Sequence, residues 1–251
     1  MTTITIGITT FEARFEEFFK PLIESIKRFE PDVEVIVAVN GEHGLPFDND
    51  YRSKMCSFCG VKKNIYPIFF PEFRGLAKLW NTILIHSTND HVLMLNDDVS
   101  IENPCFLKRI QLCIEENQQW TFIINGTWSH FVANCQEIDD IGYFDERFLG
   151  IGKEDWDMEA MYQLRYGFPI RSFDIVGMKD LCGQTCRQKP ANIICNETGK
   201  YSRFNDTIVQ EKYKTDIGGI SCKLGSSIVM REDYQKQYPH ERFYKDRRSE
   251  L

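Results

Sequence analysis

Apolar residues along this chain follow two alternating spacings, one typical of buried strands and the other of helices. Segments 3–8 and 33–39 are short, rich in β-branched residues and bounded by turn formers, so both are predicted to be buried strands. Between them one broad apolar face recurs at helical spacing, formed by Phe15, Phe18, Phe19, Leu22, Ile23, Ile26 and Phe29. Pro21 interrupts this helix, and we expect it either to begin the regular part or to kink it.

The same alternation continues along the chain. It predicts strands over 64–70, 92–95 and 120–124, with helices over 76–86 and 103–116. Strands that alternate with helices favour a parallel or mostly parallel sheet covered by helices. Ligands of such sheets bind beyond the carboxyl ends of the strands. We therefore predict an α/β fold with its functional residues at those ends.

Polar residues follow three of the predicted strands at their carboxyl ends. They are Thr9 and Thr10, Asn40 and Gly41, and the triplet Asn96-Asp97-Asp98. Hard divalent cations prefer oxygen ligands, and substrate phosphates often complete their coordination. Carboxylates at the end of a buried strand therefore suggest a metal site for a phosphorylated substrate.

A second acidic cluster, Glu154, Asp155 and Asp157, lies far downstream, after segment 142–148. A carboxylate in the same cleft as the first cluster would be free to act as a base. A simpler explanation is that a helix begins here and runs to about Tyr166, since acidic residues are common in a first helical turn. That explanation accounts for the residue type but not for the Gly-x-Phe-Asp-Glu sequence that precedes the cluster.

The composition is that of an ordinary globular chain. At 251 residues, with 42% hydrophobic and 27% charged, a single domain is expected. No stretch approaches the roughly 20 consecutive apolar residues of a membrane-spanning helix, and the first residues show no signal-peptide pattern, so we expect a cytoplasmic protein. The net charge of -7 argues against a general nucleic-acid binder but leaves room for a local basic pocket.

Nine cysteines, an odd number, are scattered along the chain. Reduced thiols are the simplest interpretation where no secretion signal is seen. Cys56 and Cys59 have the spacing of half a zinc site. The other close pair, Cys182 and Cys186, is spaced differently and lies far away, so we favour free thiols over zinc.

The composition changes only near the end, where segment 231–251 is dense in charges and tyrosines. Its charges nearly cancel, which favours a solvated or partner-packed helical tail over a surface that contacts a membrane or a glycolipid. We expect a domain over 1–220 and a C-terminal extension over 221–251. Sequons at Asn125, Asn196 and Asn205 would matter only in a secretory pathway.

Five segments together resemble one enzyme family. They are Ile8-Thr9-Thr10-Phe11, the segment 74–81, the triplet 96–98 as an Asn-Asp-Asp variant of the DxD motif, the block 142–157, and the late element 211–219. In their order and separation they resemble the family 2 glycosyltransferases, the inverting class with the GT-A fold that uses nucleotide-diphosphate sugars. The resemblance covers roughly residues 1–220 and implies a Rossmann-like, mostly parallel sheet flanked by helices.

The resemblance implies a role for each member of the triplet. Asp98 would hold manganese or magnesium, which bridges both phosphates of the donor and stabilises charge on the leaving diphosphate. Asp97 would support the metal directly or through water. Asn96 replaces the usual first aspartate, and its amide can hydrogen-bond a ribose or sugar hydroxyl.

The resemblance also implies a base in the second acidic cluster. Asp155 would take the proton from the acceptor hydroxyl while that oxygen attacks the anomeric carbon. Glu154 is the second candidate and Asp157 the third. Attack on the face opposite the diphosphate would invert the anomeric centre.

The nucleotide pocket is assigned by the same resemblance. The base and ribose would lie against Thr9, Thr10, Asn40 and Gly41. Arg74 and Lys78 would approach the nucleotide or its diphosphate, with Gly75 allowing close backbone approach and Asn81 ending the matched segment. Arg74 and Lys78 are equally well explained as a solvated helix face. Relatives often carry aspartate where this chain has Val39. Trp128 and Trp156 could stack on a sugar ring, although packing is the commoner role of a tryptophan.

Three other classes of protein compete with this interpretation. A processive polysaccharide synthase needs membrane helices and usually a Gln-x-x-Arg-Trp element, whereas segment 184–188 lacks the tryptophan. A sugar nucleotidyltransferase needs a glycine-rich basic loop after the first strand, and segment 9–13 is not one. A non-catalytic domain that binds nucleotide or glycan and regulates a partner stays open because of Val39 and Asn96.

The sequence thus predicts an inverting glycosyltransferase that moves one sugar from a nucleotide-diphosphate donor, with UDP-sugars first, to a hydroxyl of a glycan or lipid-linked acceptor. We expect Mn²⁺ or Mg²⁺ as cofactor and a place in cytoplasmic polysaccharide biosynthesis. Peripheral contact with a membrane stays open, and no nucleic-acid partner is expected.

Overall fold

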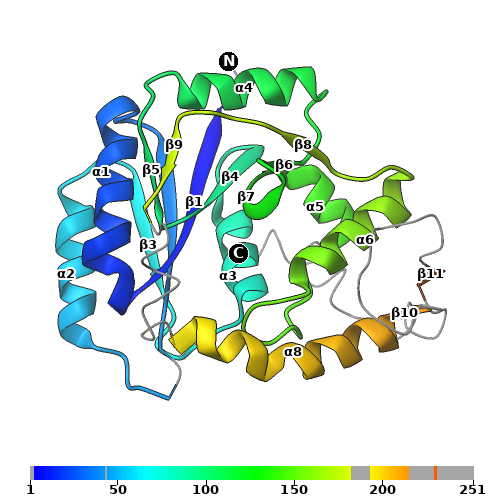
Figure 1. The fold of residues 1–251 in the computed structure, drawn as a ribbon. Helices are drawn as coiled ribbons and strands as arrows, with labels where there is room; N and C mark the ends of the chain where they lie inside the picture. The colour runs from blue at the N-terminus through cyan, green and yellow to red at the C-terminus, as the bar shows by residue number, and fades with distance from the viewer. Residues whose placement is uncertain (1–2, 43, 182–192, 215–228, 231–251) are drawn as a thin grey trace.

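A seven-stranded sheet forms the centre of the molecule in the computed structural model, which describes residues 3–42, 44–181, 193–214 and 229–230. The strand order is β3-β2-β1-β4-β7-β6-β8 (Figure 1). The strands are β1 (Ile4–Phe11), β2 (Glu34–Asn40), β3 (Ile65–Phe69), β4 (His91–Asn96), β6 (Phe122–Ile124), β7 (Thr127–Asn134) and β8 (Arg171–Phe173). All neighbours run parallel except β7, which is antiparallel to β4 and β6. The prediction of a mostly parallel α/β sheet is confirmed.

Helices cover both faces of this sheet. They are α1 (Lys20–Phe29), α2 (Asn49–Gly60), α3 (Leu76–His86), α4 (Phe106–Glu116), α5 (Cys135–Ile141) and α6 (Glu154–Tyr166). Val35, Val37 and Val39 of β2 pack into one core with α1, α2 and α4. Ile36 and Ala38 face the other core, with α3, α5 and α6. A strand covered on both faces needs a near-continuous apolar run. Segment 33–39 has such a run, which is why the sequence predicts it to be a buried strand.

The predicted first helix begins in three steps. A 3-10 turn at Glu12–Arg14 is followed by a π-helical turn at Phe15–Phe19 and then by the regular helix α1. Pro21 is the second residue of α1, where a missing N–H costs no intrahelical hydrogen bond. Of the two outcomes expected for Pro21, the structure shows that it begins the regular part.

Several described elements were not predicted, among them helix α2 and strand β7. Helix α2 buries only Tyr51, Met55 and Cys59, a stripe too narrow to stand out in the sequence. Strand β7 runs back along β6 through a two-residue turn at Asn125 and Gly126, both with positive φ, 54° and 71°. Asn-Gly is the preferred sequence of a type I′ hairpin turn, because both positions must adopt positive φ.

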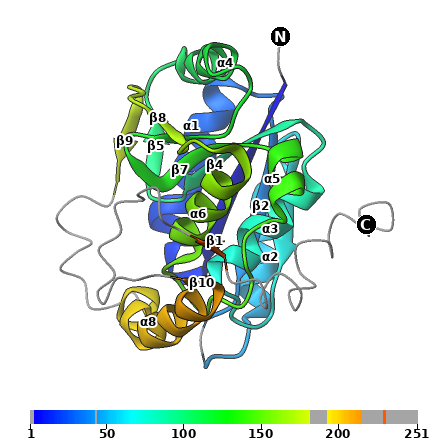
Figure 2. The ribbon, with the colours of Figure 1, turned by 90° about the vertical axis from the view of Figure 1, so that its right-hand side faces the viewer.

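Two short strand pairs and helix α8 (Ile193–Lys212) complete the described elements. Strand β5 (Val99–Ile101) pairs with β9 (Met178–Asp180), and β10 (Tyr213–Lys214) pairs with β11 (Val229–Met230). Helix α8 lies below α6 in Figure 1 and Figure 2, and its last residue, Lys212, contacts Asp157 near the start of α6. Segments 182–192, 215–228 and 231–251 lie outside the described residues, so the domain boundary near 220 and the nature of the tail stay predictions.

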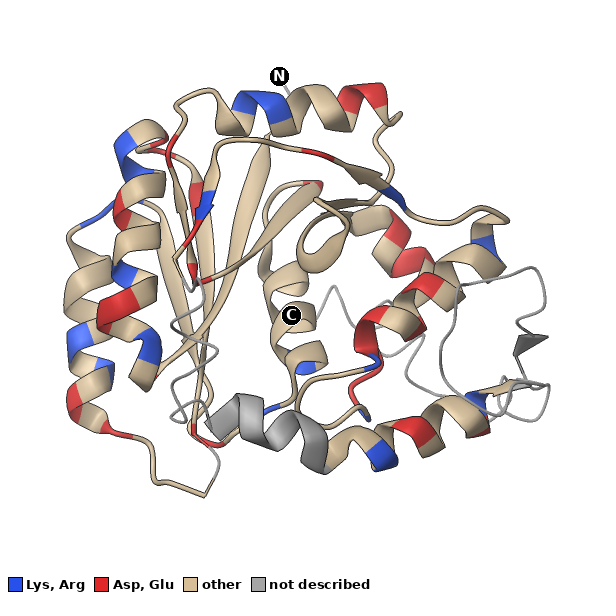
Figure 3. Cartoon of the chain, viewed as in Figure 1, with Lys and Arg blue, Asp and Glu red and all other residues tan. Residues whose placement is uncertain are grey.

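Two expectations drawn from composition can be compared with the described part of the chain. Cys56, Cys59, Cys105, Cys113 and Cys135 form no disulfide, whereas Cys182 and Cys186 fall outside the described residues. Among the helices in that part, none is long and apolar enough to cross a membrane. Basic and acidic residues are interspersed along α1 and α2 (Figure 3), which gives these helices an ordinary solvated surface.

Gly7, in the middle of β1, leaves no room for a side chain. A Cβ there would lie 2.5 Å from Cγ2 of Ile83 and 2.6 Å from Sδ of Met94. Gly7→Ala should therefore lower the free energy of unfolding by roughly 1–3 kcal/mol through overpacking, measured by urea denaturation. Gly60→Ala is the matched control, since a Cβ there meets nothing within 4 Å. Equal stability of the two variants would contradict this prediction.

Candidate functional site

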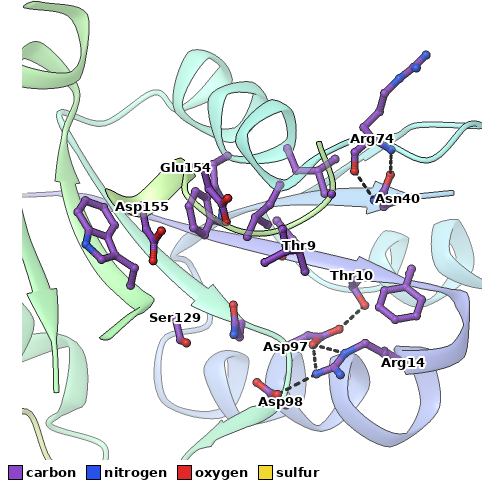
Figure 4. Close-up of a pocket in the computed structure, with 18 of the residues that line it drawn as sticks. Thr9, Thr10, Arg14, Asn40, Arg74, Asp97, Asp98, Ser129, Glu154 and Asp155 are labelled. Carbon is purple, nitrogen blue, oxygen red and sulfur yellow. Dashed lines mark hydrogen bonds and ion pairs between the residues drawn. The ribbon is translucent and has the colours of Figure 1, made fainter. Parts of the chain in front are cut away.

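A cavity of about 320 Å³ opens at the carboxyl ends of β1, β2 and β4 (Figure 4). Nine of the predicted site residues line it: Thr9, Thr10, Asn40, Arg74, Asn96, Asp97, Asp98, Glu154 and Asp155. The other predicted residues, Gly41, Gly75, Lys78 and Asn81, do not line this cavity. The fold thus brings the two acidic clusters, which are more than 50 residues apart in sequence, to opposite walls of one space.

Parallel pairing explains how the first wall forms. Thr9 of β1 is in register with Asn96 of β4, so Thr10 and Asp97 follow side by side. The hydroxyl of Thr10 donates to Oδ2 of Asp97 at 2.7 Å. Asp97 is almost fully buried, and burial raises its pKa although Arg14 and Thr10 both favour the charged form.

Arg14 is the main partner of this acidic pair, and the sequence analysis did not single it out. Its Nε and Nη2 lie 2.7 and 2.6 Å from Oδ1 of Asp97, and Nη2 lies 3.0 Å from Oδ2 of Asp98. The guanidinium also stacks 4.5 Å from the ring centre of Phe18. Its only signal in the sequence is that it is the first basic residue after β1, three positions beyond the strand.

Asn40 at the end of β2 is occupied by backbone contacts. Its Nδ2 donates to the carbonyl of Arg74 at 3.0 Å, and the N–H of Arg74 donates to its Oδ1 at 2.9 Å. A Cβ on Gly41 would lie 2.8 Å from the carbonyl oxygen of Pro71. Both residues therefore hold segment 70–75 against β2. The side chain of Arg74 pairs with Glu72 at 3.0 Å and extends away from Asp97 in Figure 4.

The predicted residues of α3 connect this helix to block 142–157. Asn81 is fully buried and exchanges two hydrogen bonds with the backbone of Phe144, at 2.8 and 3.0 Å. Lys78 pairs with Glu146 at 3.2 Å. A Cβ on Gly75 would lie 2.8 Å from the carbonyl oxygen of Phe148. The predicted segment 74–81 thus connects helix α3 to the block 142–157, which ends in the second acidic cluster.

The second acidic cluster divides between the cavity and the core. Glu154 and Asp155 open α6, as the acidic first turn predicted, and both line the cavity. Asp157 points into the core instead, where Nζ of Lys212 lies 2.7 Å from Oδ2 and the hydroxyl of Tyr213 donates to Oδ1 at 2.7 Å. Asp157, the third base candidate, is fully buried and does not line the cavity.

Glu154 is buried at the inner end of this wall. The N–H of Gly152 donates to its Oε2 at 2.6 Å. Burial, with a smaller contribution from the charge of Asp155, raises the pKa of Glu154 to about 7. Asp155 is less buried, and its Oδ1 accepts a hydrogen bond from the N–H of Trp156 at 2.8 Å.

Of the two tryptophans considered above, one reaches the cavity. Trp128 lines it and donates from Nε1 to Glu159 at 2.7 Å, which fixes the plane of its ring. Trp156 instead packs edge-on against Tyr213, with ring centres 5.2 Å apart. His130, two positions after Trp128, accepts from the N–H of Asn96 at 3.3 Å, and burial lowers its pKa.

Helix α8 holds the acidic wall from behind. The side chain of Asn205 is fully buried; its Oδ1 accepts from the N–H of Leu149, and its Nδ2 donates to the carbonyls of Leu149 and Gly152. Lys212 is also fully buried, between Asp157 and Asp145. These contacts fix the segment just before Glu154 and the start of α6. Lys212 belongs to the late segment of the family resemblance, but nothing in the sequence pointed to Asn205.

The side chains that line the cavity can be compared with the ligands that a divalent metal needs. Within the described ranges no group of three or more His, Cys, Asp or Glu side chains could hold a metal alone. Asp98 lines the cavity, and a single carboxylate completed by substrate phosphates is a common arrangement for Mg²⁺. Asp97 is occupied by Arg14 and Thr10. Asp98 therefore fits a metal bound together with a phosphorylated ligand.

Comparisons with known proteins place the fold. No family model matches the chain, and no curated protein matches it in sequence. Among solved structures, S. aureus TarS 1-349 in complex with UDP is 16% identical with a TM-score of 0.51, covering 64% of this chain and 55% of that one. S. aureus TarS is 15% identical with a TM-score of 0.56, covering 83% and 42%.

A third solved structure has the same architecture. The mannosyltransferase PcManGT from Pyrobaculum calidifontis, in complex with GDP-Man and Mn²⁺, is 12% identical with a TM-score of 0.53 and matches 68% of this chain. This chain spans 54% of that protein, so it covers about half the length of most of these structures. At such identities the likeness shows the fold, which is the GT-A fold of glycosyltransferases.

Glu154→Gln should change how stability depends on pH. The folded protein keeps the Glu154 proton up to about pH 7, whereas the ordinary pKa is 4.5. The folded state therefore binds more protons than the unfolded state in this window, and the free energy of unfolding falls as pH rises through it. The substitution removes this loss. The free energy of unfolding of the variant, relative to that of wild type, should therefore be higher at about pH 8 than at about pH 5 by roughly 2–3 kcal/mol.

Urea denaturation at the two pH values measures this gain. Glu115→Gln, the same change at an exposed position of α4, is the control and should shift stability by less than about 0.5 kcal/mol at either pH. A pH-independent effect of Glu154→Gln would mean that Glu154 is ionised in the folded protein throughout this range.

Proposed function

We propose that this protein is an inverting glycosyltransferase, which moves one sugar from a nucleotide-diphosphate donor to a hydroxyl of a glycan or lipid-linked acceptor. The observation that carries the proposal is the single cavity at the carboxyl edge of a GT-A sheet, with Asp98 on one wall and Asp155 on the other. Solved proteins with this fold bind UDP, UDP-GlcNAc and GDP-Man. UDP-sugars are the first donors to test.

In this proposal the wall made by β1, β2 and β4 binds the donor. Thr9 and Asn96 offer hydroxyl and amide groups to the ribose or the sugar, whereas the hydroxyl of Thr10 donates to Asp97 and can only accept from a ligand. Asp98 would hold Mn²⁺ or Mg²⁺, which when bound stabilises the negative charge that grows on the leaving diphosphate. Arg74 lies at the rim of the same wall. Trp128 offers an aromatic face to the transferred sugar or to the acceptor.

The opposite wall supplies the base. We assign this role to Asp155, because it lines the cavity and is less buried than Glu154. Its carboxylate takes the proton of the acceptor hydroxyl while that oxygen forms a bond to the anomeric carbon and the bond to the diphosphate breaks. Attack from the face opposite the diphosphate inverts the anomeric centre. Because the pKa of Glu154 is raised to about 7, Glu154 adds less negative charge beside the base.

A second candidate function is a non-catalytic domain that binds nucleotide or glycan and regulates a partner. It is favoured by two observations: Val39 stands where relatives often have aspartate, and Asp97 is paired with Arg14 and Thr10. Turnover of a nucleotide sugar distinguishes the two. We further propose a role in polysaccharide assembly in the cytoplasm, with contact to the membrane surface only if the acceptor is lipid-linked.

Replacement of Asp155 should separate binding from transfer. Asp155→Asn keeps the size of the side chain but removes its basicity, so the affinity for donor should change by less than about threefold while transfer falls at least about 100-fold. Calorimetric titration and mass spectrometry of the product measure the two effects. Asp32→Asn, at an exposed site, is the control. Transfer at the wild-type rate would remove Asp155 from the base role and leave Glu154 as the candidate.

Replacement of Asp98 tests the metal. In Mn²⁺, Asp98→Ala should weaken the binding of UDP, GDP or CDP, whichever the wild type binds, by at least about tenfold, because the metal loses its protein ligand. In EDTA the substitution should change affinity far less. Asp90→Ala, at an exposed position just before β4, is the control. Equal affinity of wild type and Asp98→Ala in Mn²⁺ would contradict the metal assignment.

A further inference from the structure

The described lining of the cavity carries more negative than positive side chains, so a bound diphosphate needs a cation next to it. Four carboxylates line the described walls, those of Asp97, Asp98, Glu154 and Asp155. The lysines and arginines among the described lining residues are Arg14 and Arg74. A diphosphate would be repelled by this acidic excess. Within the described lining, the cations available to the donor are therefore these two arginines.

Of the two arginines, Arg14 is held in place and Arg74 is not. The side chain of Arg74 is 47% exposed and pairs with the exposed Glu72. The side chain of Arg14 is 11% exposed and is fixed by Asp97, Asp98 and the ring of Phe18. A pre-ordered guanidinium loses little conformational entropy when a ligand binds. It also presents a planar fork that matches phosphate oxygens.

The contacts of Arg14 leave part of its guanidinium for a ligand. Its hydrogen bond and ion pairs to Asp97 and Asp98 use Nε and Nη2. The two N–H groups of Nη1 take part in none of these contacts. The same arginine is 3.0 Å from Oδ2 of Asp98, the carboxylate proposed to hold the metal. A diphosphate bound next to Asp98 would therefore lie beside Arg14.

We propose that Arg14 binds the diphosphate of the donor directly, so that nucleotide diphosphates bind this protein without a divalent metal and the metal only adds affinity. The inference rests on the proposed donor class. Asp97 then acts as a positioning residue, which orients Arg14 rather than coordinating the metal. The alternative is that Arg14 does no more than neutralise the buried charge of Asp97.

A double variant separates these two roles. Arg14→Met alone would leave Asp97 buried without its counter-ion, and that variant could fail to fold. Combining Arg14→Met with Asp97→Asn removes both charges, and the new amide can still accept the hydrogen bond from Thr10. The double variant should therefore fold, as checked by circular dichroism and thermal melting. Lys20→Met, which breaks an exposed pair with Glu16, is the control for loss of one positive charge.

The test is calorimetric titration of the 251-residue chain with UDP, GDP and CDP, in EDTA and again in Mn²⁺. We expect the wild type to bind one of these nucleotides in EDTA, and the double variant to lose at least about tenfold in that affinity. Lys20→Met should bind like wild type. Arg14→Lys should fall between wild type and the double variant, because lysine keeps the charge but not the fork.

Three results would overturn the inference. Wild-type affinity in EDTA for a folded double variant would reduce Arg14 to a counter-ion. Binding by the wild type in Mn²⁺ but not in EDTA would show that the metal is required, and would leave the proposed glycosyltransferase function standing. No binding of any of the three nucleotides under either condition would overturn the proposed function together with the inference.

Discussion

The pairing of β1 with both β2 and β4 is the constraint on which the site depends. Because all three strands are parallel, their polar ends emerge at one edge, with Thr9 beside Asn96 and Phe11 beside Asn40. The residues at or just beyond these strand ends have different roles. Thr10 and Arg14 hold the acidic pair, whereas Asn40 holds the backbone that leads to α3. A shift in register between β1 and β4 would separate Thr10 from Asp97, so the cavity wall formed by the ends of these strands would lose its arrangement.

The opposite wall depends on buried contacts over long sequence separations. Asn205 fixes the backbone of Leu149 and Gly152, and Lys212 joins α8 to α6 through Asp157. Buried charges of this kind add little net stability, but removal of one partner is costly because the other is left unpaired. The position of Asp155 is therefore set by a helix that begins nearly 40 residues later in the chain.

Local spacing was enough to predict strands β1 to β4 and β6, helix α3 and the two acidic clusters, because periodicity and strand ends are properties of short segments. It could not predict the role of Arg14, whose partner Asp97 is 83 positions away. It also could not predict that Asp157 points into the core toward Lys212. Asn40 and Asn81 were recognised as important residues, but the structure shows them bonded to backbone. The reversed strand β7 carries a local signal, the Asn125-Gly126 dipeptide, but it departs from the alternation of strands and helices on which the other predictions rest.

The burial of Asn205 has a practical consequence for making the protein. Asn205, Asp206 and Thr207 form an acceptor sequence for N-linked sugar. In the folded chain the Asn205 amide has no exposed surface and is bonded to Leu149 and Gly152. An oligosaccharide transferred there during secretion from a eukaryotic host would prevent α8 from docking. Recombinant material should therefore come from a host compartment that lacks oligosaccharyltransferase.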